Sequence, residues 1–187
     1  LQTLDYTYNI RGWLETINPF DNAADLFAMK LYYKNGDPLL HTDYTGGANS
    51  NWNGNITMLE WQVNNTAHRM YGFFYDGRNQ LKRGESGTRT NNAASPVLNT
   101  DYKTDYTYDN AGLSSNLKTV TRRGLLSGTS TFGVIDQMTY TYNTAGHLTQ
   151  IVEAGSATKG FKSTSGGTYT YDLNGNRLTA TDRKSVV

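Results

Sequence analysis

In five short segments of this chain, two aromatic residues are separated by a single residue, which is a period of two. Each segment holds two aromatic residues one position apart, and in four of the five the residue between them is threonine. Successive side chains of a β-strand point to opposite faces, so a period of two places both rings on one face. The pattern therefore predicts five strands that each carry a pair of rings on one face.

The aromatic pairs belong to a repeated motif. An asparagine or aspartate follows the second ring, and a turn residue and a leucine follow a few positions later. The copies begin at positions 6, 73, 106, 140 and 169, and the first interval is about twice the next. An atypical copy is therefore expected between residues 20 and 70, with its remnant at 52–56 (WNGNI). The repeat aromatics are Tyr6, Tyr8, Phe73, Tyr75, Tyr106, Tyr108, Tyr140, Tyr142, Tyr169 and Tyr171.

The residues after each aromatic pair predict a tight turn. Asparagine or aspartate suits the first position of a type I turn, where its side chain accepts bonds from the backbone ahead. Glycine three residues later suits the left-handed position that closes such a turn with a bulge. The expected turn glycines are Gly12, Gly112, Gly146 and Gly175, while Asn79 fills this position in the second copy. The third turn is expected to be three residues longer than the others, and the last copy reads as one residue longer before Leu178.

A second strand is expected to return after each turn, at residues 13–17, 116–122, 147–153 and 176–181. Each repeat is thus a β-hairpin, and rings of adjacent hairpins are expected to stack into ladders. Residues 25–33 (DLFAMKLYY) are predicted to form a further strand, and long loops are expected near 84–101 and 154–167. The fold class is all-β: antiparallel hairpin repeats in a twisted, curved sheet, with 1–187 as a single repeat region.

Composition supports this fold class and narrows the function. The acidic residues comprise 12 Asp and only 4 Glu, and the chain holds 14 Tyr and 19 Gly, which favours strands and turns over helices. A net charge of +1 with 18% charged residues gives no electrostatic footprint for nucleic acid. The sequence contains no apolar run of the roughly 20 residues that a membrane helix needs. We therefore expect neither a nucleic-acid partner nor membrane insertion.

The pattern Y-x-Y-[DN]-x-x-G-x-L resembles the YD repeat of the RHS family, which occurs in polymorphic toxins, insecticidal toxin complexes and teneurins. Within that family, LDYTYNIRGWLETIN, DLFAMKLYY, NGNITMLEW and YDLNGNRLTATDRKSV are most similar to repeat proteins of Bacteroidetes. The resemblance implies a β-shell whose wall the tyrosines line, enclosing or displaying a C-terminal effector domain of the parent chain. It also implies a secreted or cell-surface protein, although no targeting signal stands in this segment.

The chain departs from the family at one functional point. Self-cleaving members carry a DPxGL motif at the end of the shell, whereas the one Asp-Pro here, Asp37-Pro38, lies early and is followed by Leu39-Leu40. The cleavage motif is absent, and the segment is expected to be part of a longer array.

Candidate catalytic and metal-binding residues are few. Asp76, Asp109 and Asp172 occupy the turn position that Asn9 and Asn143 fill in other copies, so hydrogen bonding explains them better than proton transfer.

Glu60 and Glu153 show no partner in the sequence, and the three histidines are scattered. His41 lies near Asp37 and Asp43, but such residues are ordinary in a polar loop. We expect no enzyme activity, no cofactor and no metal.

The aromatic residues give two hypotheses of function. The first is a non-catalytic scaffold, in which the rings stabilise the sheet itself. The alternative is a carbohydrate-binding or adhesion module at the cell surface, in which exposed rings stack on sugars. The candidate glycan-stacking residues are Trp13, Trp52 and Trp61.

Overall fold

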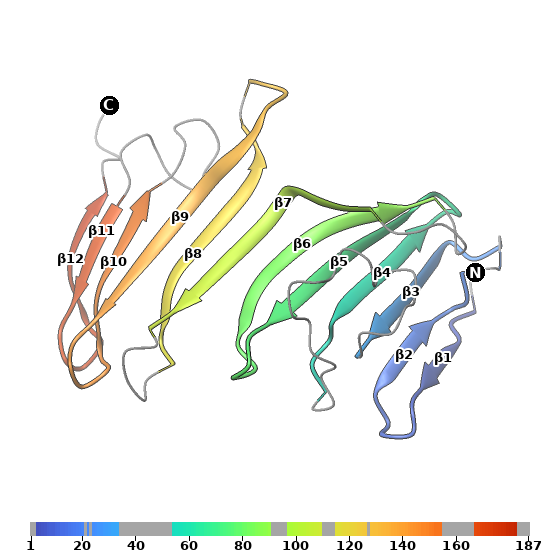
Figure 1. The fold of residues 1–187 in the computed structure, drawn as a ribbon, viewed down its shortest axis with the longest axis horizontal. Coiled ribbons are helices and arrows are strands. Elements are labelled where there is room, and N and C mark those ends of the chain that lie inside the picture. Colours follow the sequence, from blue (N-terminus) through green and yellow to red (C-terminus); the bar gives the residue numbers. More distant parts are fainter. Residues whose placement is uncertain are drawn as a thin grey trace. The chain divides into compact units, whose positions relative to one another are not determined.

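The computed structural model describes residues 3–20, 22, 24–33, 54–90, 97–109, 115–126, 128–154 and 167–182. All regular secondary structure in these ranges is β-strand (Figure 1). The strands are β1 (Tyr6–Tyr8), β2 (Leu14–Ile17), β3 (Phe27–Tyr32), β4 (Met58–Val63), β5 (His68–Tyr75), β6 (Leu81–Arg89), β7 (Val97–Tyr108), β8 (Leu117–Leu125), β9 (Phe132–Tyr142), β10 (Leu148–Ala154), β11 (Gly167–Tyr171) and β12 (Arg177–Asp182).

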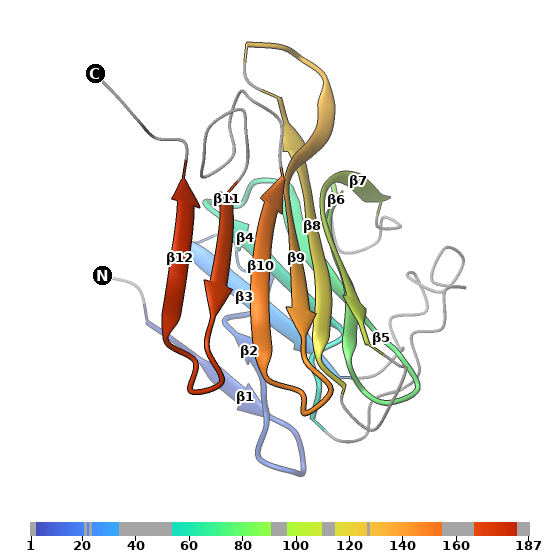
Figure 2. The same cartoon turned by 90° about the vertical axis from the view of Figure 1, so that its left-hand side faces the viewer.

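The strands lie in the sheet in the order in which they occur in the chain, from β1 to β12. Neighbouring strands run antiparallel wherever their register is defined. The chain forms two compact units, Leu1–Thr100 and Asp101–Val187. In the second unit, β9 to β12 lie side by side in one layer (Figure 2). The predicted all-β, antiparallel fold class is confirmed.

The turns of four hairpins share one set of hydrogen bonds. In the β9–β10 turn, the Asn143 amide donates to the His147 carbonyl (2.9 Å) and the Gly146 amide donates to the Asn143 carbonyl (2.9 Å). The Asn143 side-chain oxygen accepts from the amides of Ala145 (3.0 Å) and His147 (2.9 Å). The same bonds recur around Asn9, Asp76 and Asp172.

The left-handed turn position is occupied as the sequence predicts, with φ of +75° at Gly12, +69° at Asn79, +83° at Gly146 and +81° at Gly175. Gly112 lies outside the described residues. In that copy the Asp109 amide donates to the Asn116 carbonyl (2.8 Å), so its turn is longer than the others, as expected.

Each hairpin carries a β-bulge beside the second aromatic residue of the motif. Tyr142 pairs with Leu148, whereas the preceding Thr141 pairs with Gln150, so Thr149 is the extra residue. In the last copy the leucine comes one residue later than in the others, and the structure shows where the extra residue lies. Tyr171 pairs with Arg177, which takes the place of the motif leucine, and Leu178 is the exposed bulge residue. This turn is therefore no longer than the others.

The atypical copy is split between two distant segments. Gly54, with φ of +95°, precedes Asn55 and Ile56 just as Gly12 precedes Trp13 and Leu14. The aromatic half of this copy is residues 31–33 (LYY) at the end of β3, and residues 34–53 separate the two halves. The remnant expected at 52–56 is therefore only the second half of the copy, and Trp52 itself lies outside the described residues.

Two further expectations about the chain can be compared with the strands. The strand predicted at 25–33 is confirmed as β3. The long loop expected at 84–101 is wrong, because β6 extends to Arg89 and β7 begins at Val97. Gly84 and Gly87 stand in β6, where small residues fit against large neighbours: a Cβ at Gly84 would lie 2.6 Å from the Tyr71 ring. Most of the loop expected at 154–167 lies outside the described residues.

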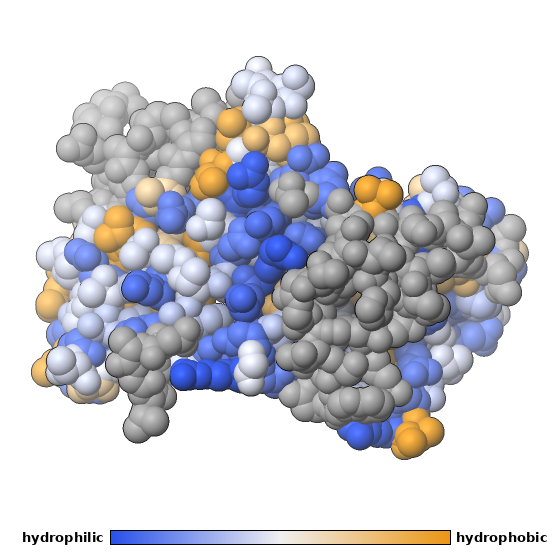
Figure 3. Space-filling model, viewed as in Figure 1, coloured by the Kyte–Doolittle hydropathy of each residue, from blue (hydrophilic) through white to orange (hydrophobic). Residues whose placement is uncertain are grey.

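The two faces of the sheet differ in the first unit. Side chains alternate along β4 and β5, so Met58, Met70 and Phe74 are buried on one face. In the surface view, hydrophobic residues gather near the tip of the β8–β9 hairpin, where Leu125 is exposed (Figure 3). The buried face of the first unit is not purely apolar, and it holds the main polar cluster of the described residues.

Candidate functional site

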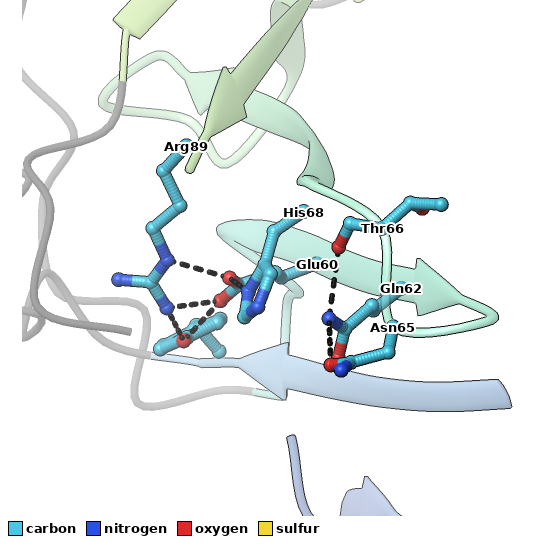
Figure 4. Close-up of polar contacts among 7 residues, drawn as sticks. Glu60, Gln62, Asn65, Thr66, His68 and Arg89 are labelled. Atoms are coloured by element: carbon cyan, nitrogen blue, oxygen red, sulfur yellow. Dashed lines mark hydrogen bonds and ion pairs between the residues drawn. The ribbon is translucent and has the colours of Figure 1, made fainter. Parts of the chain in front are cut away.

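A buried cluster of polar side chains surrounds Glu60 on β4 (Figure 4). The Glu60 side chain is fully buried, with a relative accessibility of 0%. One carboxylate oxygen, Oε1, lies 2.6 Å from His68 Nδ1 and accepts from Arg89 Nε at 2.6 Å. The other, Oε2, accepts from Arg89 Nη2 at 2.5 Å and from the Tyr32 hydroxyl at 2.6 Å. Both oxygens are therefore saturated by partners from three other strands.

The alternation of the strands brings these residues to one face. His68 on β5 stands directly opposite Arg89 on β6, and Glu60 on β4 stands opposite Met70, two residues beyond His68. Tyr32 comes from β3, so the cluster joins four consecutive strands. The sequence analysis missed this cluster, but the spacing of Met58, Glu60 and Gln62 on one buried face could have indicated it.

The geometry makes the Glu60 cluster an anchor. Arg89 binds the carboxylate with two nitrogens, the strongest arrangement for an ion pair. The Arg89 guanidinium and the Glu60 carboxylate carry opposite charges, and the His68 ring nitrogen Nδ1 completes the contacts of Oε1. The centroids of the Phe20 and His68 rings lie 4.5 Å apart, with the rings tilted by 35°. We expect this buried ion pair to hold its strands in one register, because breaking it would leave a charge buried alone.

Beside this cluster, the Gln62 side chain donates to the Asn65 side-chain oxygen (3.1 Å) and to the Thr66 carbonyl (2.8 Å). These bonds brace the β4–β5 turn, in which Asn64 and Asn65 both adopt positive φ.

A second arrangement recurs between hairpins. The Tyr142 hydroxyl donates to the Leu117 carbonyl at 2.8 Å, which ties the β9–β10 hairpin to the start of the return strand before it. Tyr75 binds the Ile56 carbonyl (2.9 Å) in the same way, and Tyr33 binds the Leu14 carbonyl (2.8 Å). We call this contact the inter-hairpin tyrosine bond.

Burial raises the pKa of the tyrosines that form these bonds, so their hydroxyls keep the proton that they donate. For Tyr33 the nearby Glu15 carboxylate adds to the effect of burial, and for Tyr142 the neighbouring Tyr140 does so.

The first ring of each motif occupies a different setting. Tyr140 stands opposite Ile151, and Ile151 stands opposite Tyr169, so an aliphatic side chain separates the two rings in register. The direct ring-on-ring ladder that the sequence suggested is therefore wrong here. Motif tyrosines occupy alternate strands, and the return strand stands between them.

The remaining repeat aromatics lie on strands. Tyr6 and Tyr8 are exposed, while Phe73 is half-buried, with its ring centroid 5.3 Å from that of Tyr71. Tyr106, Tyr108 and Tyr171 are half-buried as well, and Tyr169 is buried.

The opposite face of the hairpins carries paired threonines, which the sequence analysis did not single out. The threonine between two motif rings meets a threonine of the return strand at 2.6 Å between hydroxyl oxygens. These pairs are Thr7–Thr16, Thr107–Thr119 and Thr170–Thr179.

The tryptophans proposed for glycan stacking differ in their surroundings. The Trp13 ring lies 5.1 Å from the Tyr33 ring and 5.2 Å from the Arg11 guanidinium, and it also packs on Gly54. Trp13 is thus part of the packing between two hairpins. Trp61 lines an open hollow of about 420 Å³ at the β4–β5 turn. The other residues of this hollow are Val63, Asn64, Thr66, Ala67 and Arg69.

Within the described ranges, no three histidine, aspartate or glutamate side chains are grouped so that they could hold a metal ion. His41, Asp37 and Asp43 lie outside those ranges, and His147 stands exposed in a turn. No helix long and apolar enough to cross a bilayer is present in the part of the chain that the structure describes.

No family model and no curated protein matches the chain. Among solved structures, the chain is similar to one described as the crystal structure of TcdB2-TccC3-TEV, with a TM-score of 0.34 and 15% identity. The match covers 93% of this chain and only 9% of the other chain.

Proposed function

We propose that the chain is a non-catalytic structural wall, a segment of an RHS-type shell that encloses or displays an effector domain of its parent chain outside the cell. One observation carries the proposal: the same turn and the same inter-hairpin tyrosine bond are repeated along the sheet. Repetition of one unit extends a surface, whereas a catalytic site needs a local departure from the repeat.

The chemistry of the polar residues supports the same function. Glu60 has the burial of a catalytic carboxylate, yet its oxygens are fully engaged with Arg89, His68 and Tyr32. Asp76 and Asp172 bind turn amides, as Asn143 does. These carboxylates therefore contribute to the rigidity of the sheet.

Limited proteolysis of the longest natural chain that contains this segment tests the wall function. We expect an effector domain to resist cleavage in the wild type and to become sensitive when Tyr75→Phe and Tyr142→Phe remove two inter-hairpin bonds. Tyr6→Phe, which changes an exposed ring, is the matched control. Equal cleavage rates in the wild type and in the double variant would contradict enclosure.

The Trp61 hollow favours carbohydrate binding as a second candidate function. It combines one aromatic ring with the amide of Asn64 and the guanidinium of Arg69, a mixture of apolar and polar groups that is typical of ligand pockets. A glycan array tests this function, with binding expected for the wild type and lost in Trp61→Ala. Arg69→Gln changes an exposed side chain and serves as the second variant. Absence of glycan binding by the wild type would reject this candidate.

A further inference from the structure

Three side chains of the Trp61 hollow take no part in holding the sheet together. By alternation along β4, Trp61 points to the face opposite the Glu60 cluster. The indole of Trp61, the side-chain amide of Asn64 and the guanidinium of Arg69 line the hollow without a hydrogen bond or ion pair to the described part of the chain. These polar groups are therefore open to a ligand.

Two other arginines of the first unit are paired within the sheet. Arg89 binds the Glu60 carboxylate, and Arg83 Nε lies 3.2 Å from a Glu85 carboxylate oxygen. The lining of the hollow, as far as the structure describes it, contains no aspartate or glutamate that could play this part for Arg69. Water satisfies the exposed guanidinium in the free protein, and a carboxylate on a ligand would satisfy it when the hollow is filled.

The strand register sets the aromatic ring beside the cation. Trp61 on β4 pairs directly with Arg69 on β5, and the Cβ atoms of such a pair lie about 4.5–5.5 Å apart. On its other side Trp61 pairs with Met29 of β3. A ligand that lies on the indole therefore meets an apolar side chain at one end and a positive charge at the other.

The turn that forms the rim of the hollow is preorganised. Asn64 and Asn65 adopt φ of +48° and +53°, and the Asn64 backbone amide donates to the Leu26 carbonyl at 2.8 Å. The buried Gln62 side chain donates to the Asn65 side chain and to the Thr66 carbonyl (Figure 4). Because these bonds fix the backbone, a ligand does not have to order the rim when it binds.

We infer that the Trp61 hollow binds an acidic saccharide, a sugar chain whose rings carry carboxylates. The indole stacks on the C–H face of one sugar ring, and the Arg69 guanidinium donates two hydrogen bonds to the carboxylate. The Asn64 amide can both donate to and accept from a sugar hydroxyl. This inference rests on the carbohydrate-binding function proposed above as the second candidate, and it names the class of glycan.

Both parts of this ligand are needed to use the groups of the hollow. A neutral sugar would cover the Arg69 guanidinium without supplying a counter-charge, which costs desolvation free energy. An acidic peptide would supply the charge but presents no rigid ring face to the indole. The volume of about 420 Å³ lies at the small end of the range for ligand sites, about 300–1,000 Å³, so it suits a short stretch of a longer chain.

Calorimetric titration of the 187-residue chain with a matched pair of saccharides tests the class of ligand. The pair is an oligogalacturonate and its methyl ester, which have the same sugar rings but differ in charge. The acid should bind the wild type about tenfold more tightly than the ester, as expected for one hydrogen-bonded ion pair. Raising the salt concentration should weaken binding of the acid and leave binding of the ester unchanged.

Arginine substitutions supply the matched variants. Arg69→Gln should reduce the preference for the acid over the ester to about one. Arg78→Gln changes an exposed arginine of the β5–β6 turn, outside the hollow, and should leave the preference unchanged. Arg69→Lys keeps the charge but not the two-pronged contact, so it should keep part of the preference. The urea midpoint of each variant shows whether the sheet remains folded.

The outcomes separate this inference from the function on which it rests. Equal binding of the acid and the ester by the wild type would overturn the acidic class while carbohydrate binding stood. A preference that survives in Arg69→Gln would overturn the role of the hollow. Oligoglutamate bound as tightly as oligogalacturonate would overturn the saccharide and indicate an acidic peptide. No binding of either saccharide would reject both the inference and the second candidate function.

Discussion

Replacing Glu60 with glutamine is expected to destabilise the first unit severely. Glutamine keeps the shape of the side chain but removes its charge and one acceptor oxygen. Arg89, with only 5% of its surface exposed, would then be a buried cation without its counter-charge. Breaking a buried ion pair from one side typically costs about 3–5 kcal/mol.

The size of this effect can be set against the stability of a small domain. Domains unfold with a free energy of about 5–15 kcal/mol, so Glu60→Gln would remove a large share. With a urea m-value of about 1.5 kcal/mol per molar, the denaturation midpoint would fall by about 2–3 M.

Tryptophan fluorescence in a urea titration is the appropriate assay, because all three tryptophans precede residue 101 and report on the first unit. Glu15→Gln is the matched control, since Glu15 is exposed on β2, and it should change stability by less than about 0.5 kcal/mol.

Adding Arg89→Met to Glu60→Gln should recover part of the loss, because the buried cation is removed as well. A midpoint within about 0.7 M of the wild type for Glu60→Gln would refute the view that the Glu60 cluster anchors the strands.

Three further predictions follow from the repeat. Gly146→Val should lower the melting temperature, because φ of +83° strains a β-branched residue by about 1–3 kcal/mol. Gly77→Val, in the open part of another turn, should leave the melting temperature nearly unchanged. Tyr142→Phe should lower the free energy of unfolding in chemical denaturation by about 1 kcal/mol, because the bond to the Leu117 carbonyl is lost. A change below about 0.3 kcal/mol, on the order of experimental error, would show that the bond is dispensable.

Hydrogen bonds from the Asn176 side chain and from turn amides lower the pKa of Asp172, so its contribution is present above the ordinary carboxyl pKa and is lost as pH falls through the lowered value. NMR titration should show this low pKa. Asp172→Asn should abolish this titration and keep the turn, because Asn143 forms the same turn bonds in its own copy. An ordinary pKa at Asp172 would contradict the turn geometry.

The hairpins could be predicted from the sequence because each depends on contacts between near neighbours. An asparagine or aspartate and a left-handed residue three positions later define a turn, and both are visible within a few residues. Asn79 was correctly placed in this position although it is not glycine. The split copy at Tyr33 and Gly54 was only half recognised, because twenty residues separate its two halves and the local pattern is broken.

The Glu60 cluster shows what local patterns omit. Its members Tyr32, Glu60, His68 and Arg89 are spread over 58 positions of the chain and share no motif. They meet because four strands adopt one register, and register is a property of the assembled sheet. For the same reason the ladder of adjacent rings was wrong, since the sequence shows which residues share a face but not which strand stands between them.

The sequence by itself determined the all-β class, the hairpin turns and the positions that require positive φ, because these depend on the conformational preferences of a few consecutive residues. Only the tertiary structure decided which side chains meet across strands. It brought a buried glutamate to its arginine and tied each motif tyrosine of three hairpins to a carbonyl of the hairpin before it. The physical reason is that a shift of strand register changes every cross-strand partner while leaving the local pattern of the sequence unchanged.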